Sequence, residues 1–184
     1  MNRRRMKTVE MKLLSELMKN SRRSDRELAK AVGVSQPTIS RMLKKLEKEG
    51  LVKEYTIIPD LAKIGNDFVA ITFLSFAEDR PELFDKAKEW TRKQPSVLFA
   101  NNGEGMGMNS IMVSVHSDYG SYSRLITQLR RDWQPNLKGA ETFMVSLTRP
   151  EMAIKPFSFR YPGIGKLADL EATEAGSRRK TKRS

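Results

Sequence analysis

The stretch SDRELAKAVGVSQPTISRMLKKLEKEG, residues 24–50, decides the fold of the first third of the chain. Its opening Ser24, with Glu27 three residues later, forms a capping-box pattern and predicts a helix that runs to about Val32. Gly33 follows, and a glycine can take the positive φ that a tight turn requires. We therefore expect a short helix that ends in a turn at Gly33.

A second helix is expected directly after this turn. Ser35 can serve as its N-cap, and Pro37 lies in its first turn, where the missing N–H is tolerated. Gly50 is placed to end it in a left-handed conformation. Upstream, apolar residues at helical spacing predict a further helix over about Thr8–Lys19.

The pattern is typical of a helix-turn-helix, in which two helices cross closely around a small core. Ala29 is the small residue that lets the helices approach, and Gly33 is the turn. Residues 51–58 predict a strand pair, or wing, that ends at Pro59-Asp60. The positions expected to be buried are Leu28, Val32, Val34, Ile39, Met42, Leu43 and Leu46.

The exposed face of helix 36–49 is expected to enter the major groove of double-stranded DNA. Gln can bond adenine with two hydrogen bonds, and Arg can do the same to guanine, whereas Lys more often contacts phosphates. The candidate base readers are Gln36, Ser40, Arg41 and Lys44, and the full candidate DNA-binding set is Ser35, Gln36, Thr38, Ser40, Arg41, Lys44, Lys45 and Lys48. The alternative is that Lys44, Lys45 and Lys48 form a solvated face beside Glu47 and Glu49.

The net charge of +12 is distributed unevenly along the chain. Residues 1–60 carry +7, residues 61–148 are neutral, and residues 149–184 carry +5. Positive ends around a neutral centre favour a head that binds a polyanion and a separate partner module. Lysine-rich surfaces that only maintain solubility are the plain alternative.

After a linker over 61–67, the sequence predicts the order strand, helix, strand, strand, helix, strand. This βαββαβ order is typical of a ferredoxin-like α+β domain, with two helices on one face of a four-stranded antiparallel sheet. The expected strands are Phe68–Phe76, Val97–Asn101, Ser110–His116 and Ala140–Thr148, and the expected helices are Pro81–Lys93 and Gly120–Trp133.

The first of these strands is apolar on both faces, with Val69, Ile71 and Phe73 on the face that the two helices would not cover. The uncovered face must meet another surface, most simply that of a second subunit. A homodimer through this domain is therefore expected.

Residues 28–50, followed by LVKEYTIIPD at 51–60, resemble the Lrp/AsnC regulators of bacteria and archaea. The similarity extends more loosely, as βαββαβ order, to about Thr148. The resemblance implies a transcription factor whose ferredoxin-like domain dimerises, assembles further into tetramers or octamers in some members, and often binds an amino acid or another small metabolite.

The same resemblance directs attention to the hairpin GEGMGMN at 103–109. Relatives that bind amino acids carry an acidic motif there, and Gly103, Glu104 and Gly105 are the matching candidate effector residues. Glu104 could hold an ammonium group, but the aspartates of the motif are absent. A flexible glycine-rich hairpin without a ligand is the alternative.

Composition excludes several kinds of chemistry. The chain has no cysteine and one histidine, His116, which is expected to be on the surface or hydrogen-bonded locally. A metal site, a cofactor site or a nucleophile–base pair is therefore not expected, and neither is an enzymatic role. The longest apolar stretch, 68–77, is about half of a membrane span, so we expect a cytoplasmic protein.

The sequence thus predicts a winged helix-turn-helix with a basic arm over 1–60, a linker over 61–67, a dimerisation and effector domain over 68–148, and an extension with a basic tail over 149–184. A sequence-specific transcriptional regulator is the first interpretation. An architectural protein that binds DNA without sequence preference, and a winged helix that binds protein instead, remain alternatives.

Overall fold

The computed structural model describes residues 6–77, 81–155, 157 and 158, and these residues form two compact units. The first contains residues 6–58 together with the described residues after Ile154, and the second runs from Pro59 to Ile154. The sequence could also form a short helix over 163–175; this segment and the basic tail lie outside the described residues, as do Arg3, Arg4 and Arg5 of the basic arm.

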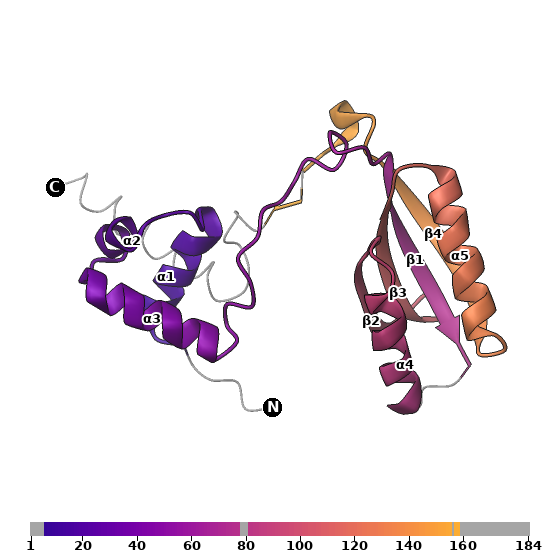
Figure 1. Ribbon diagram of the computed structural model, residues 1–184, viewed down its shortest axis with the longest axis horizontal. Helices are drawn as coiled ribbons and strands as arrows, with labels where there is room; N and C mark the ends of the chain where they lie inside the picture. Colours follow the sequence, from indigo (N-terminus) through magenta and orange to yellow (C-terminus); the bar gives the residue numbers. More distant parts are fainter. Residues whose placement is uncertain (1–5, 78–80, 156, 159–184) are drawn as a thin grey trace. The chain divides into compact units, whose positions relative to one another are not determined.

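The first unit is built from three helices, α1 (Thr8–Lys19), α2 (Asp25–Val32) and α3 (Gln36–Lys48) (Figure 1). Apolar residues recur every three to four positions in each helix, so each presents one apolar side to the others. Their shared core contains Leu13, Leu17, Leu28, Ala29, Val32, Ile39 and Leu46, with Val34, Met42, Leu43 and Val52 packed against it. All seven positions expected to be buried contribute to this core, although Val34, Met42 and Leu43 are only half-buried.

Local signals fix where these helices begin and end. Ser24 caps α2, since its hydroxyl accepts from the backbone N–H of Glu27 while the Glu27 carboxylate accepts from the N–H of Ser24 at 2.8 Å. Gly33 ends α2 at φ 84° and Gly50 follows α3 at φ 67°, both in the left-handed region. Ser35 occupies the N-cap of α3, but its hydroxyl is not bonded to a backbone N–H of that helix.

The segment after α3 differs from the expected strand pair. Residues 51–58 form no strand, and Tyr55, Ile57 and Ile58 are exposed. A β-prone sequence needs a partner strand to pair with, and within the described chain no segment pairs with this one. The prediction of a strand pair at 51–58 was therefore wrong for the single chain.

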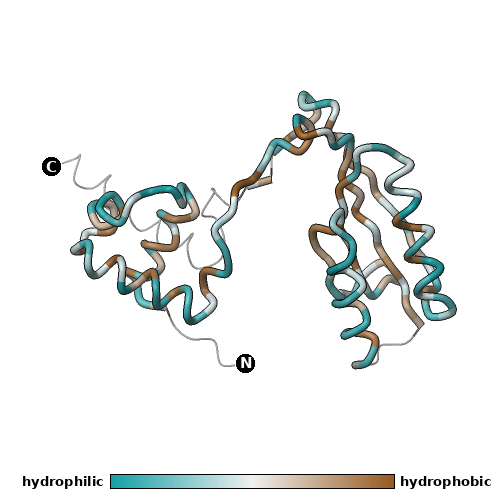
Figure 2. The backbone as a smooth tube through the Cα atoms, viewed as in Figure 1, coloured by the Kyte–Doolittle hydropathy of each residue, from teal (hydrophilic) through white to brown (hydrophobic). Residues whose placement is uncertain are grey.

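The second unit is the predicted ferredoxin-like domain, a four-stranded antiparallel sheet in the order β2-β3-β1-β4. Its strands are β1 (Phe68–Phe76), β2 (Val97–Gly105), β3 (Met108–His116) and β4 (Leu137–Ser146), and its helices are α4 (Pro81–Arg92) and α5 (Tyr119–Trp133). Hydrophobic residues run along the central strand β1 in the hydropathy colouring of Figure 2. A short 3-10 turn, η1 (Pro150–Met152), follows the sheet.

Both helices pack on one face of this sheet (Figure 1). The core between them contains Leu74 and Met112 from the sheet, Trp90 from α4, and Leu129 and Trp133 from α5. No described helix covers the opposite face, which carries Val69, Ile71 and Phe73 in the middle and the exposed Phe143 beside Ile71. The prediction that β1 is apolar on both faces is thus confirmed.

Candidate nucleic-acid interface

The turn between α2 and α3 determines how α3 is presented. The N–H groups of Gly33 and Val34 both donate to the carbonyl of Ala29, at 2.9 and 3.1 Å. The chain then passes through an extended Ser35 into α3, with Pro37 in its first turn. Ile39 and Leu46 are fully buried in the core of the head, so the opposite side of α3 faces outward.

This outward side carries most of the predicted DNA-binding residues. Ser35, Gln36, Arg41, Lys44, Lys45 and Lys48 are exposed, whereas Thr38 and Ser40 are half-buried. Against these four basic side chains, α3 contains one acidic residue, Glu47. The surface is therefore basic and rich in hydrogen-bond donors, as a DNA-contacting helix requires.

Two of the predicted residues are engaged with the scaffold. The Ser40 hydroxyl donates to the carboxylate of Asp25 in α2 and, at 3.3 Å, to the carbonyl of Gln36. The Lys45 ammonium donates to Glu10 Oε1 at 2.8 Å, and Glu10 is 3% exposed. Ser40 thus joins α2 to α3, and Lys45 joins α3 to α1.

Glu10 is a functional part of this region that the sequence reasoning did not identify. Its second carboxylate oxygen accepts from the backbone N–H of Lys7 at 3.0 Å, which completes the start of α1. Glu10, Lys45, Arg41 and Lys7 line one hollow of about 240 Å³ between α1 and α3. The only local signal was the acidic residue in the first turn of α1, because its partner lies 35 residues away.

Arg41 remains well suited to reading a base. Its Nε donates to the carbonyl of Pro37 at 3.3 Å, which orients the side chain along the helix. A guanidinium has five N–H donors, so four remain for other partners. At the start of α3 the Ser35 and Thr38 hydroxyls are 2.8 Å apart and bonded to each other.

Tyr55, in the segment after α3, was also not anticipated. Its hydroxyl donates to Glu47 Oε1 at 3.0 Å, so the exit segment is fastened to α3. Partial burial of the phenol, together with this hydrogen bond to a carboxylate, raises the pKa of Tyr55 to about 12. The phenol therefore stays protonated at physiological pH and keeps donating.

The candidate effector hairpin is ordered by a two-residue turn. Met106 and Gly107 both have positive φ, at 54° and 72°, and Gly105 pairs with Met108. Such a turn matches the twist of the flanking strands. Gly103, Glu104 and Gly105 are all exposed, and no described cavity is lined by them.

The lone histidine is buried rather than on the surface, and it is hydrogen-bonded locally. His116 is 2% exposed, with Nε2 2.8 Å from the Ser114 hydroxyl and Nδ1 3.3 Å from the Ser121 hydroxyl. Asp118 and Asp132 lie at opposite ends of α5. Across the described ranges, no cluster of three His, Cys, Asp or Glu could hold a metal ion. No helix there is long and apolar enough to span a membrane.

Comparisons with known proteins agree with this geometry. Residues 6–53 match the family described as winged helix-turn-helix DNA-binding. An uncharacterized HTH-type transcriptional regulator of Pyrococcus furiosus is 41% identical over 62 residues, which are 34% of this chain and 42% of that protein. The match spans less than half of the first curated relatives.

Longer matches cover both units. The HTH-type transcriptional regulator LrpC of Bacillus subtilis is 24% identical over 109 residues, 59% of this chain and 74% of LrpC. Its solved structure has a TM-score of 0.64 and covers 77% of this chain and 95% of that one at 21% identity. The Neisseria meningitidis regulator NMB0573 in complex with L-Met has a TM-score of 0.70 at 21% identity, covering 87% and 98%.

Proposed function

We propose that this chain, which is similar to the Lrp/AsnC transcriptional regulators, is a sequence-specific regulator that binds double-stranded DNA as a homodimer. The observation that carries the proposal is the outward face of α3. Gln36, Arg41, Lys44 and Lys48 are exposed on a helix whose other side is fixed in the core of the head. Such a helix can lie in the major groove.

The candidate DNA-binding residues divide by their contacts. Gln36, Arg41 and Lys44 are our proposed base readers, because they are exposed on the first two turns or so of α3, the part that usually reaches base edges. Lys48 is proposed to contact phosphate. Ser40 and Lys45 are proposed to position α3, since their bonds to Asp25 and Glu10 already hold them.

The homodimer is proposed to form through the uncovered face of the sheet. Cross-strand neighbours on that face are Ile71 with Val113 and Phe143, and Val69 with Val115 and Val145. Phe143 is 66% exposed. A continuous apolar face of this kind is typical of a subunit interface.

We also propose that a small-molecule effector modulates the protein and that the protein has no enzymatic role. NMB0573, which shares the fold, is known in complex with L-Met. The residues Gly103, Glu104 and Gly105 remain a candidate effector site by their position in the hairpin. The proteins that this chain resembles are named as transcriptional regulators, which supports a role without catalysis.

Selection of bound genomic fragments, followed by competition binding at about 150 mM salt, tests the proposal. The protein should prefer its selected site over random duplex by about a thousandfold or more. Arg41→Ala should reduce that preference, whereas Lys48→Ala should weaken all duplexes alike and lower the slope of log affinity against log salt by about one.

Two outcomes would contradict the proposal in different ways. Equal affinity for selected and random duplex would favour an architectural DNA-binding protein. No duplex binding even at low salt would indicate a winged helix that binds protein instead.

A further inference from the structure

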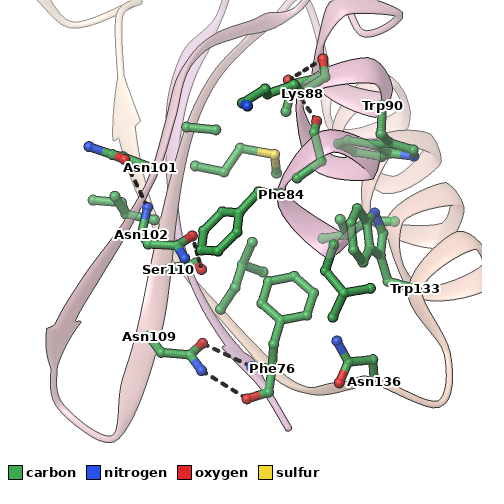
Figure 3. A pocket seen from close by; sticks show the side chains of 18 residues that line it. Phe76, Phe84, Lys88, Trp90, Asn101, Asn102, Asn109, Ser110, Trp133 and Asn136 are labelled. Atoms are coloured by element: carbon green, nitrogen blue, oxygen red, sulfur yellow. Dashed lines mark hydrogen bonds between the residues drawn. The ribbon is translucent and has the colours of Figure 1, made fainter. Parts of the chain in front are cut away.

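A cavity of about 290 Å³ lies in the second unit, between α4 and the sheet (Figure 3). Its walls are mostly apolar. Leu74 and Phe76 come from β1, Met112 from β3, Phe84 and Trp90 from α4, and Trp133 from α5. A volume of this size is near the lower limit for small-molecule pockets in proteins, and a mostly apolar lining is typical of them.

Polar residues also line this cavity, mainly on its sheet side and at its rim: Lys88, Thr91, Asn101, Asn102, Asn109, Ser110 and Asn136. The Asn109 side chain forms two hydrogen bonds with the backbone of Phe76. Its Oδ1 accepts from the N–H of Phe76 at 2.9 Å, and its Nδ2 donates to the carbonyl of Phe76 at 2.8 Å. The Thr91 hydroxyl donates back into its own helix. Ser110 donates to Asn102 Oδ1 at 3.1 Å, and this pair forms the polar spot on the β2–β3 wall.

The charge of the cavity lining is positive. Among the described residues that line the cavity, Lys88 is the charged one, and none is an aspartate or glutamate. The Lys88 ammonium is 2.9 Å from Asp85 Oδ1, in an exposed i, i+3 pair with side chains 64% and 81% exposed. Such pairs contribute little free energy, so a ligand carboxylate can take the place of Asp85.

From this lining we infer that the cavity binds a small monocarboxylate with an apolar or aromatic body, and that it discriminates against free α-amino acids. The apolar body would fill the space between Phe76, Phe84 and Trp133, and the carboxylate would lie toward Lys88. An ammonium group here would meet neutral amide and hydroxyl oxygens but no carboxylate, so its lost hydration would be offset only in part. Glu104 does not line this cavity and supplies none.

This inference deepens the proposed effector regulation, on which it rests only for the link to DNA binding. The binding itself is a property of the second unit. It can therefore be measured without DNA, and its failure would leave the DNA-binding proposal intact.

Intrinsic fluorescence offers a direct test. The chain has two tryptophans, and both Trp90 and Trp133 line the cavity, so the indole signal reports occupancy. The full chain is titrated with 3-phenylpropanoate, L-phenylalanine and 2-phenylethylamine, with excitation at the red edge of indole absorption, where phenyl rings do not absorb. These probes share one ring and differ in their charged groups.

We expect saturable binding of 3-phenylpropanoate and at least about tenfold weaker binding of the two amines. Equal or tighter binding of L-phenylalanine would overturn the inferred ligand class. Absence of a saturable signal with every probe up to about 10 mM would overturn the site itself, because binding weaker than that is not specific recognition of a filled cavity.

Matched variants locate the ligand. Ala100→Phe, on the exposed edge strand β2, should fill the cavity and abolish binding, while Leu98→Phe on the same strand, outside the lining, should not. Lys88→Gln should weaken 3-phenylpropanoate about two- to fivefold and leave neutral 3-phenylpropanamide unchanged. Lys93→Gln, which removes the comparable exposed pair with Glu89, is the control. Equal effects of each variant and its control would contradict the assignment.

Discussion

At the scale of single residues, the lysines of α3 differ in their contacts, although the sequence alone does not distinguish them. Lys45 pairs with the buried Glu10, whereas Lys48 is exposed and is proposed to contact phosphate. Lys45→Gln should destabilise the head by about 1–2 kcal/mol, because a buried carboxylate loses a charged partner. Lys48→Gln should change stability by less than about 0.5 kcal/mol.

Thermal unfolding followed by circular dichroism, alongside binding to duplex DNA, distinguishes these roles. Lys48→Gln should lower affinity for DNA in the folded protein. If Lys45→Gln left stability unchanged and Lys48→Gln lowered it, the division of tasks would be reversed.

His116 makes the second unit sensitive to acid. Burial lowers the pKa of His116, and the nearby Asp118 only partly opposes this shift. Because the unfolded chain then binds a proton at a higher pH than the folded one, stability is full above the ordinary pKa of 6.5 and is lost as pH falls through it. The unit should therefore melt at a lower temperature at about pH 5 than at about pH 7.

The variant His116→Asn isolates this contribution, since the chain has no other histidine. Carboxylates such as Asp118, whose pKa is lowered by hydrogen bonds from Ser121 and Ser117, titrate at lower pH in both proteins. The difference in melting temperature between wild type and variant, followed by tryptophan fluorescence, should change between about pH 7 and about pH 5. A constant difference would exclude His116 as the cause.

At the scale of elements, the turn between α2 and α3 depends on one backbone conformation. Gly33 has φ 84° and ψ 38°, and a Cβ there would meet nothing within 4 Å. The strain of Gly33→Ala is thus conformational rather than steric crowding by neighbours, and we expect a loss of about 1–2 kcal/mol. Gly103→Ala, at an equally open position without positive φ, should be nearly neutral when both variants are denatured chemically.

Elements were predictable where the signal was local. Ser24, Gly33 and Gly50 marked the ends of α2 and α3 because capping and left-handed residues act within a few positions. The strand β2 runs four residues beyond its expected end at Asn101, because backbone pairing across the Met106-Gly107 turn does not require apolar side chains. Pairing with β1 likewise shifts β4 to begin at Leu137 and end at Ser146.

The parts that could not be predicted depend on distant partners. Ser40 and Lys45 looked like free surface residues, since Asp25 and Glu10 lie 15 and 35 residues away in sequence. The prediction of a strand pair at 51–58 was wrong for a different reason. The alternation of apolar and polar residues in this segment is typical of a strand, but no local feature indicates whether a partner strand exists.

At the scale of the whole molecule, assembly is expected to depend on the uncovered face of the sheet. Phe143 lies on that face beside Ile71, whereas its neighbour Met144 pairs with Ala70 on the face that carries the helices. Phe143→Arg should convert a dimer into a monomer, because it places a charge in an apolar interface. Met144→Arg, which is also exposed, should not.

Sedimentation velocity at micromolar concentration shows whether each of these two variants is a dimer or a monomer. Circular dichroism should confirm that both variants remain folded. A dimer that survives Phe143→Arg, or a wild-type protein that sediments as a monomer, would contradict the proposed interface.

The hydrogen bond from Tyr55 to Glu47 has a consequence for operator architecture. It fastens the exit segment to α3, so the free tether begins at residue 56 rather than at residue 51. The stretch from Tyr55 to Pro59, where the second unit begins, can span at most about 14 Å, well below the pitch of about 34 Å of one DNA turn. In the proposed dimer, a single phenol would thus limit how far each DNA-reading unit can travel, and with it the range of half-site spacings that the dimer accepts.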